Sequence, residues 1–367
     1  MARVMAWNVM RIGNLGRMGV LWTLALLYSY LHLLFLYPRL RRSPYSVPQS
    51  RAAASDLKPA SIVTGASSGI GKATAIALAL QGFHVILAGR SLKRLREVVA
   101  EIKRKHKDVS VQALELDLCL VPSILSFVKT IQVLFEGENP PGKLQLLVNN
   151  AGILATSQRW TSDEFDCMMA SNYLGPYMLT CQLLPLLYKN APRARIVNVV
   201  SFTHRCVRSL QVDEGGLMQG TLQTSSYNGD WYSLARIYET SKLCMLLFSY
   251  ELHRRLHSKE APSQISVMAA DPGAVASNIL REMPHFLVGL SNLVLTLLTL
   301  LQSPTVGAAS VVDAALAPWE ISGKYYFGGR GLTCQSSQIS YNRNLANELW
   351  EASAAVSERV MSRYGAN

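Results

Sequence analysis

Between residues 60 and 327, short β-branched runs alternate with segments of helical length, and this alternation constrains the fold more than any other feature. The runs that predict strands are 60–64, 84–88, 110–115, 144–149, 195–200, 265–270 and 324–327. The segments that predict crossover helices are 71–80, 91–105, 121–135, 173–189 and 233–257. Such alternation is typical of a parallel sheet with helices on both faces. The sequence therefore predicts an α/β fold, a doubly wound parallel sheet in one domain spanning 60–330.

The residues before this domain predict an appendage in three parts. Residues 18–37 carry no formal charge, and 20 such residues match the length of a helix that crosses a bilayer. We therefore expect a basic leader at 1–17, a transmembrane signal anchor at 18–37, and a proline-bearing linker at 38–59. Arginines flank the anchor about equally. The sequence favours the endoplasmic reticulum membrane with a cytosolic catalytic domain, and a mitochondrial or plastid membrane is the alternative.

Charge and cysteine content argue against two other classes of protein. The net charge is +12, but residues 1–51 hold seven arginines and no acid, so the remainder is near +5. The later basic run, 93–107, is interleaved with acids, as on a solvated helix face. We therefore expect no nucleic-acid partner. The six cysteines and seven histidines are scattered without metal-ligand spacing, so no metal site is predicted.

A glycine-rich stretch stands between the first predicted strand and the helix after it. It runs Thr64-Gly65-Ala66-Ser67-Ser68-Gly69-Ile70-Gly71. Glycines allow a tight turn and a close backbone approach, and the helix N-terminus offers unpaired N–H groups to a pyrophosphate. The stretch predicts a Rossmann-type dinucleotide site, with Gly65, Ser67, Ser68, Gly69, Ile70 and Gly71 as cofactor-binding residues.

The end of the second strand bears on which dinucleotide is bound. A fold that prefers NAD places an acid about twenty residues beyond the glycines, to hold both ribose hydroxyls. Here the strand ends in Gly89-Arg90-Ser91. A guanidinium can pair bidentately with a 2′-phosphate, and the serine can donate to it. We therefore predict NADP(H) in preference to NAD(H), with Arg90 and Ser91 as binding residues.

Six motifs in order resemble those of the short-chain dehydrogenase/reductase family, over nearly all of 60–327. Besides the glycine stretch they are Asn149-Asn150-Ala151-Gly152, Asn172 within Ser171-Asn172-Tyr173-Leu174-Gly175, Ser201 after Asn198-Val199-Val200, Tyr238-Glu239-Thr240-Ser241-Lys242, and Asp271-Pro272-Gly273. Two departures are Val200, where a second serine is common, and Asp271 before Pro-Gly. We expect neither departure to touch the proton path through Tyr238 and Lys242.

In a helix, Tyr238 and Lys242 lie one turn apart on one face, so the ammonium is expected to bring the pKa of the phenol closer to the working pH. Tyr238 would then be the general acid/base that exchanges a proton with an alcohol or carbonyl. The resemblance implies that Ser201 holds the substrate oxygen, that Lys242 contacts the nicotinamide ribose, and that Asn172 relays protons through water to Lys242. It further implies cofactor contacts from Asp117, Leu118, Asn149, Ala151, Gly152, Pro272 and Gly273.

Two segments bear on the substrate. Tyr238 follows Ser201 by 37 positions, and this separation resembles the extended loop of the retinol-dehydrogenase-like branch, including the family member encoded on the X chromosome. Residues 286–302 are uncharged, and we interpret them as an apolar lid that rests on a bilayer, with a core helix as the alternative. Residues 331–367 predict a helical tail packed on the sheet or on a partner.

These observations predict a membrane-bound, NADP(H)-dependent oxidoreductase. It would interconvert a lipophilic alcohol with its aldehyde or ketone, the substrate being retinoid-, polyprenol- or sterol-like. The alternatives are a lipid ketoreductase and a membrane protein that senses NADPH without turnover. The expected partners are the lipophilic substrate and the bilayer, with a homodimer as the candidate assembly.

Overall fold

A seven-stranded parallel sheet forms the centre of the molecule, with strand order β3-β2-β1-β4-β5-β6-β7. The computed structural model describes residues 2–36, 58–190, 193–222, 234–258 and 264–365. Each predicted strand is confirmed to within one residue at either end. The strands are β1 (Pro59–Thr64), β2 (His84–Gly89), β3 (Ser110–Glu115), β4 (Lys143–Asn149), β5 (Ala194–Val199), β6 (Ile265–Asp271) and β7 (Lys324–Phe327).

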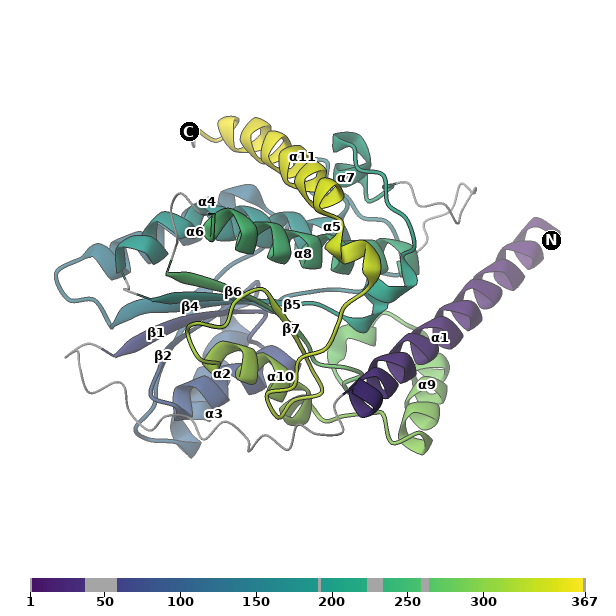
Figure 1. Cartoon of the computed structure of the whole chain (residues 1–367), viewed down its shortest axis with the longest axis horizontal. Helices are drawn as coiled ribbons and strands as arrows, with labels where there is room; N and C mark the ends of the chain where they lie inside the picture. The colour runs from purple at the N-terminus through teal and green to yellow at the C-terminus, as the bar shows by residue number, and fades with distance from the viewer. Residues whose placement is uncertain (1, 37–57, 191–192, 223–233, 259–263, 366–367) are drawn as a thin grey trace.

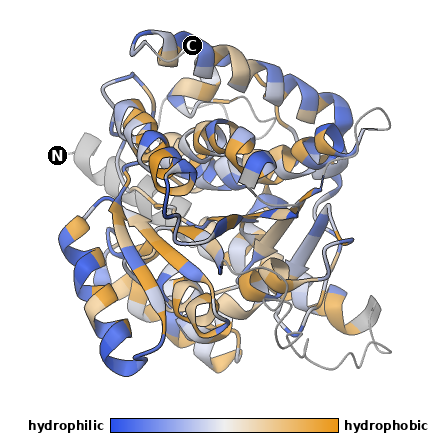
Figure 2. Cartoon of the chain, turned by 90° about the vertical axis from the view of Figure 1, so that its left-hand side faces the viewer, coloured by the Kyte–Doolittle hydropathy of each residue, from blue (hydrophilic) through white to orange (hydrophobic). Residues whose placement is uncertain are grey.

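Helices cover both faces of the sheet, as the doubly wound prediction requires (Figure 1). One layer holds α2 (Gly69–Leu80), α3 (Leu92–Lys105) and α10 (Pro304–Leu316), and the other holds α4 (Val121–Glu136), α6 (Gly175–Asn190) and α8 (Leu234–Leu256). Neighbouring residues of β1 point to opposite faces, because Ile62 belongs to the apolar core on one side and Val63 to that on the other. Figure 2 shows the hydrophobic strands enclosed between these layers.

The helix predicted at 173–189 begins earlier and in a different form. A short helix, α5 (Cys167–Met169), leads into a π-helical turn, η2 (Ala170–Leu174), and then into α6. Turns of this kind are uncommon and are often found at functional sites. Here the π-helical turn contains Asn172, whose side chain is buried.

The amino-terminal segment forms one long helix, α1 (Ala2–Leu36), which contains most of the predicted anchor. Among the residues that the structure describes, no helix combines the length and the apolar character needed to cross a membrane. The predicted transmembrane anchor at 18–37 is thus not confirmed by the described residues. Part of the helix surface packs on the catalytic domain instead: Leu26 and Ser29 are buried, while Val20, Leu24 and Leu34 on other faces are exposed. Most of the predicted linker at 38–59 lies outside the described residues.

Two helices that follow β6 bear on the predictions for residues 286–302 and for the carboxyl-terminal tail. Helix α9 (His285–Leu297) contains no buried residue, so the alternative of a core helix within 286–302 is wrong. The carboxyl-terminal helix, α11 (Arg343–Ser362), packs on α8 and on the short α7 (Glu214–Gln219), so it covers a helix layer and not the sheet. Trp350 of α11 stacks on Phe248 of α8, with the ring centroids 5.9 Å apart.

Candidate active site

The glycine-rich turn after β1 forms a bare backbone cradle at the point where the strand order reverses. Gly65 and Gly69 have φ values of +67° and +56°, which other residues rarely adopt. A Cβ atom on Gly71 would lie 2.4 Å from the Asn150 amide nitrogen and 2.5 Å from the Gly65 carbonyl oxygen. The backbone of this turn must therefore stay free of side chains, as close approach to a pyrophosphate requires.

The turn after β4 is joined to the glycine turn by hydrogen bonds. The backbone N–H groups of Asn150 and Ala151 each donate to the Thr64 hydroxyl at 3.0 Å, and the Asn150 side chain donates to the Thr64 carbonyl at 2.8 Å. Asn149 lies deeper and donates to Thr180 and Asn198 at 2.9 and 2.8 Å. The carboxyl ends of β1 and β4 thus form one rigid crevice, where ligands of such sheets bind.

A cavity of about 280 Å³ lies beside this crevice, and its walls include Arg90, Asp117 and Cys119. Arg90 is exposed, and Ser91 accepts a hydrogen bond from the N–H of Arg94 at 3.4 Å as the cap of α3. The Asp117 carboxylate accepts from the N–H of Cys119 at 2.9 Å, so it is fixed by its own turn. Arg90 and Asp117 therefore line one cavity, and their roles as cofactor-binding residues stay predictions.

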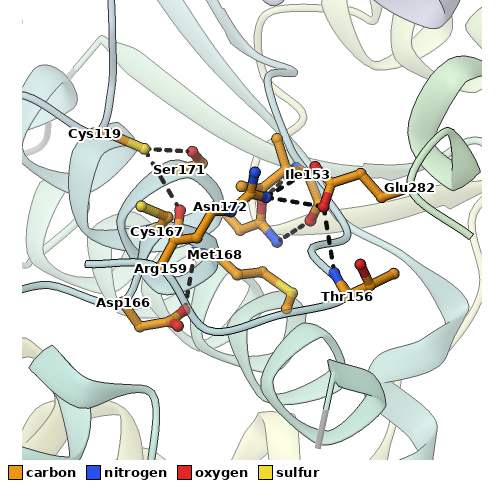
Figure 3. Close-up of polar contacts among 10 residues, drawn as sticks. All are labelled: Cys119, Ile153, Thr156, Arg159, Asp166, Cys167, Met168, Ser171, Asn172 and Glu282. Atoms are coloured by element: carbon orange, nitrogen blue, oxygen red, sulfur yellow. Dashed lines mark hydrogen bonds and ion pairs between the residues drawn. The ribbon is translucent and has the colours of Figure 1, made fainter. Parts of the chain in front are cut away.

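An ion pair joins two loops at the same cavity, and sequence reasoning missed it. Arg159, which follows β4, donates to both oxygens of Glu282, which follows β6, at 2.8 and 3.1 Å (Figure 3). The Glu282 carboxylate also accepts from the N–H of Thr156 at 3.4 Å. The loop bearing Glu282 reaches the glycine turn, because a Cβ on Gly69 would lie 3.4 Å from the Cβ of Ser277. No sequence pattern signals a pair 123 positions apart.

Tyr238 and Lys242 lie on α8 one turn apart, as predicted, and both are buried. The Lys242 ammonium is 5.8 Å from the centre of the Tyr238 ring, and it donates to the Val199 carbonyl at 3.1 Å. Ser201 follows β5 and is buried, its hydroxyl accepts from the N–H of Thr203 at 3.4 Å, and it lowers the pKa of the Tyr238 phenol. A Cβ on Gly152 would lie 3.5 Å from the Lys242 nitrogen, so the second turn also borders this group.

The protonation of this group differs from the sequence-based expectation. Burial raises the pKa of Tyr238, the charge of Asp271 raises it further, and the bond with Ser201 lowers it by less. Burial also lowers the pKa of Lys242 to about 8, against the attraction of Asp271. The expected lowering of the Tyr238 pKa is therefore wrong here, because burial withdraws the phenol from water and raises its pKa. Burial thus favours the protonated form of the phenol.

The side chains of Asn172 and His204 form hydrogen bonds that connect the segments around Tyr238 and Ser201. The Asn172 side chain accepts from the Ile153 N–H at 2.8 Å and donates to the Ile153 carbonyl at 3.0 Å and to the Ser241 hydroxyl at 3.1 Å. It does not bond directly to Lys242 in this network. His204 bridges the Ser201 carbonyl, at 2.6 Å, and the N–H of Ser337, at 3.1 Å, so the start of the long loop is fixed to the tail.

The side chains around the phenol are apolar. A buried cluster of Ile153, Leu154, Ala155, Met168, Ile237 and Tyr238 is extended by the half-buried Ile279, Leu280 and Trp22. Five of these come from segments that leave the carboxyl edge of the sheet, three after β4 and two after β6, and Trp22 comes from α1. Within the extended loop between Ser201 and Tyr238, residues 223–233 lie outside the described residues.

The carboxyl end of β6 completes the site. Gly273 has a φ of +72°, and its N–H donates to the Asp271 carboxylate at 2.8 Å. The other Asp271 oxygen accepts from the Tyr325 hydroxyl at 2.6 Å. Burial raises the pKa of Asp271 to about 6. The aspartate before Pro272-Gly273 therefore fixes this turn next to the catalytic group.

Comparison with known proteins agrees with this geometry. The family described as short chain dehydrogenase matches residues 60–211. Human polyprenol dehydrogenase is 34% identical over 80% of this chain and 83% of its own length. Human WW domain-containing oxidoreductase is 36% identical over 83% of this chain and 69% of its own. The chain therefore belongs to the short-chain dehydrogenase/reductase family of oxidoreductases. These matches leave the particular resemblance to the member encoded on the X chromosome unconfirmed.

Solved structures share the fold. A protein from Mycobacterium paratuberculosis aligns with a TM-score of 0.60 and 26% identity over 83% of this chain and 96% of its own. L-Sorbose reductase from Gluconobacter frateurii, solved with NADPH and L-sorbose, aligns with a TM-score of 0.54 at 20% identity, over 74% and 96% of the two chains. At that identity the likeness concerns the fold alone.

Proposed function

We propose that this protein is an NADP(H)-dependent oxidoreductase that interconverts a lipophilic alcohol with its aldehyde or ketone. The observation that carries the proposal is the apolar cluster around the Tyr238 phenol, which offers a substrate almost no polar partner besides the reacting groups. The name of the human polyprenol dehydrogenase supports a polyprenol-like substrate over the retinoid- and sterol-like ones. The alternative, a lipid ketoreductase, would use the same chemistry on a ketone of a different lipid.

Each residue around the Tyr238 phenol has a separate role in the proposed reaction. Ser201 and Tyr238 together hold the substrate oxygen, and Tyr238 donates its proton to that oxygen during carbonyl reduction and takes it back during alcohol oxidation. The bound nicotinamide supplies or accepts the hydride. Lys242 returns the proton to Tyr238, and Asn172 positions the Ile153 backbone that borders the group. A phenol held protonated by burial suits the reductive direction.

The cofactor would lie along the crevice between the glycine turn and the turn after β4. Gly65, Gly69 and Gly71 leave the backbone bare for the pyrophosphate, and Gly152 leaves room beside Lys242. Arg90, exposed at the cavity that also contains Asp117, is available to pair with a 2′-phosphate. These features support NADP(H) in preference to NAD(H).

Membrane association forms part of the proposal. Helix α9 exposes Phe286, Leu290, Leu293 and Leu297, and α1 lies at the same end of the molecule (Figure 1). Exposed apolar surface of this extent, next to a leader rich in arginine, suits the surface of a bilayer with anionic lipids. We place the protein at the endoplasmic reticulum membrane, facing the cytosol, and expect a homodimer. Cell imaging and light scattering test these two points, with mitochondria or plastids and a monomer as the contrary results.

The test is an assay of the full chain in phospholipid vesicles. Reduced-nicotinamide absorbance is followed with NADPH or NADH and a panel of aldehydes and ketones, from polyprenal and retinal to sterol ketones. The proposal predicts oxidation of NADPH with lipophilic carbonyls. NADPH binding without turnover on any of them would favour the non-catalytic alternative.

A further inference from the structure

Helix α1 lies across the candidate active site and contacts it at several places. The Ser29 hydroxyl accepts from Arg205 at 2.9 Å, and the Cys206 sulfur lies 4.0 Å from the Leu21 carbonyl oxygen. Arg205 and Cys206 belong to η3 (Phe202–Cys206), the turn that begins directly after Ser201. The helix is therefore attached to the segment that carries one of the proposed catalytic residues.

The innermost contact is made by Trp22. Its ring centroid is 5.5 Å from that of Tyr238, with an angle of 39° between the rings. Its indole N–H donates to the Glu239 carboxylate at 2.6 Å. This bond holds the indole beside Tyr238, a residue that is only 7% exposed. The indole therefore forms part of the apolar surroundings of the Tyr238 ring.

A second contact of α1 lies at the turn after β6. A Cβ on Gly273 would lie 3.3 Å from the Tyr30 hydroxyl oxygen. The Tyr30 ring packs on Phe327 with centroids 5.0 Å apart, and its hydroxyl accepts from Gln302. Helix α1 thus borders both the proton donor and the Pro-Gly turn.

We propose that α1 forms a wall of the substrate site and that Trp22 is a specificity-determining residue. The proposal rests on the function given above and extends it. The apolar indole face would pack along a long hydrocarbon chain and exclude water from the reacting carbonyl, whereas a short aldehyde would need neither effect. A segment outside the sheet and outside all six motifs thereby selects the substrate.

Kinetics of the full chain in detergent micelles test this role. The variant Trp22→Ala is compared with wild type on NADPH reduction of geranylgeranial, a long isoprenoid aldehyde, and of butanal, a short one. The ratio of kcat/KM for the long over the short substrate should fall about tenfold, with Kd for NADPH unchanged. Trp22→Phe should keep most of the ratio. Leu24→Ala, an exposed position on the same helix, is the matched control and should leave it unchanged. An unaltered ratio in Trp22→Ala, or an equal fall in Leu24→Ala, overturns the proposal.

A chemical cross-link tests the docking of α1 without any assay of activity. The variant Leu21→Cys places a thiol near the native Cys206, and a short bismaleimide should join the two, so that protease cleavage between them leaves the fragments linked. The same treatment of Leu21→Cys/Cys206→Ser should give no such link. Absence of the Cys206-dependent link would show that α1 does not lie here, whether or not the protein reduces carbonyls.

Discussion

The Lys242 ammonium donates a hydrogen bond to the Val199 carbonyl oxygen at 3.1 Å, and the lysine side chain is buried. Burial lowers the pKa of this lysine to about 8, and Asp271 keeps it from falling further. Carbonyl reduction consumes a proton through Tyr238, whose pKa lies above that of an ordinary phenol. Lys242 is therefore the first group in the proton path to lose its proton as the pH rises.

This ordering predicts the alkaline limb of the pH profile. In the reductive direction kcat should be highest below pH 8 and should decline as the pH rises through about 8, because neutral Lys242 no longer returns a proton to Tyr238. Initial rates at saturating NADPH and substrate between neutral and alkaline pH measure it. A profile that stays flat until the phenol itself ionises would contradict the assignment.

The variant Asp271→Asn tests the electrostatic origin of that limb. Removal of the carboxylate takes away the attraction that raises the Lys242 pKa, so the alkaline limb should move to lower pH. Asparagine can still accept from the Gly273 N–H, which limits disturbance of the turn. A limb that does not move, in a variant with unchanged melting temperature, would exclude coupling between the two groups.

Arg90 should determine the choice of cofactor. Arg90→Asp removes the group that pairs with a 2′-phosphate and introduces repulsion, so Kd for NADPH should rise about 10- to 100-fold, as loss of a charged hydrogen bond implies. Binding of NADH should be unaffected or improved. Titration of nicotinamide fluorescence with both cofactors measures this, with the exposed Arg94→Asp on α3 as the control. An equal loss for both cofactors would contradict the role.

Arg195 is a structural residue whose loss should destabilise the domain. Its guanidinium is fully buried and donates to carbonyl oxygens at the end of α10 and beyond, those of Ala314, Ala315, Ala317 and Pro318, at 2.5 to 3.2 Å. Arg195→Met leaves these acceptors unpaired, and the free energy of unfolding should fall by about 3 kcal/mol or more. Urea denaturation measures the change. A loss below about 1 kcal/mol would mean that water replaces the guanidinium.

The exposed face of α9 should carry membrane affinity. Leu290 and Leu293 are each 57% exposed, so Leu290→Asp/Leu293→Asp should leave the fold intact while adding charge where lipid would contact. Flotation with vesicles that contain anionic lipid should recover less of the variant than of wild type. Val133→Asp, at an exposed position on α4, is the control. Equal recovery of all three proteins would argue against α9 as a membrane contact.

The sheet could be predicted from sequence because its signal is local. Each strand is a short β-branched run bounded by turn residues, and the glycine stretch marks the reversal of strand order by its position after β1. The π-helical turn at Asn172 escaped prediction, because the extra residue depends on the bonds that Asn172 makes to Ile153 and Ser241, far away in the sequence.

The site was predictable only in part for a similar reason. Motifs identify Tyr238, Lys242 and Ser201, but burial decides their protonation, and burial is a property of the folded chain. The apolar run in α1 has the composition of a membrane anchor. That one of its faces packs on the domain through Trp22 and Ser29 depends on partners near residues 205 and 239.

The most direct test of the account is a comparison of wild type with Tyr238→Phe, incorporated into vesicles with polyprenal and NADPH. Wild type should oxidise NADPH in proportion to the polyprenol formed. The variant should bind NADPH with the same Kd and reduce polyprenal at least 100- to 10,000-fold more slowly, roughly the contribution of a positioned general acid. Turnover by Tyr238→Phe within a few-fold of wild type would contradict the proposed chemistry at its centre.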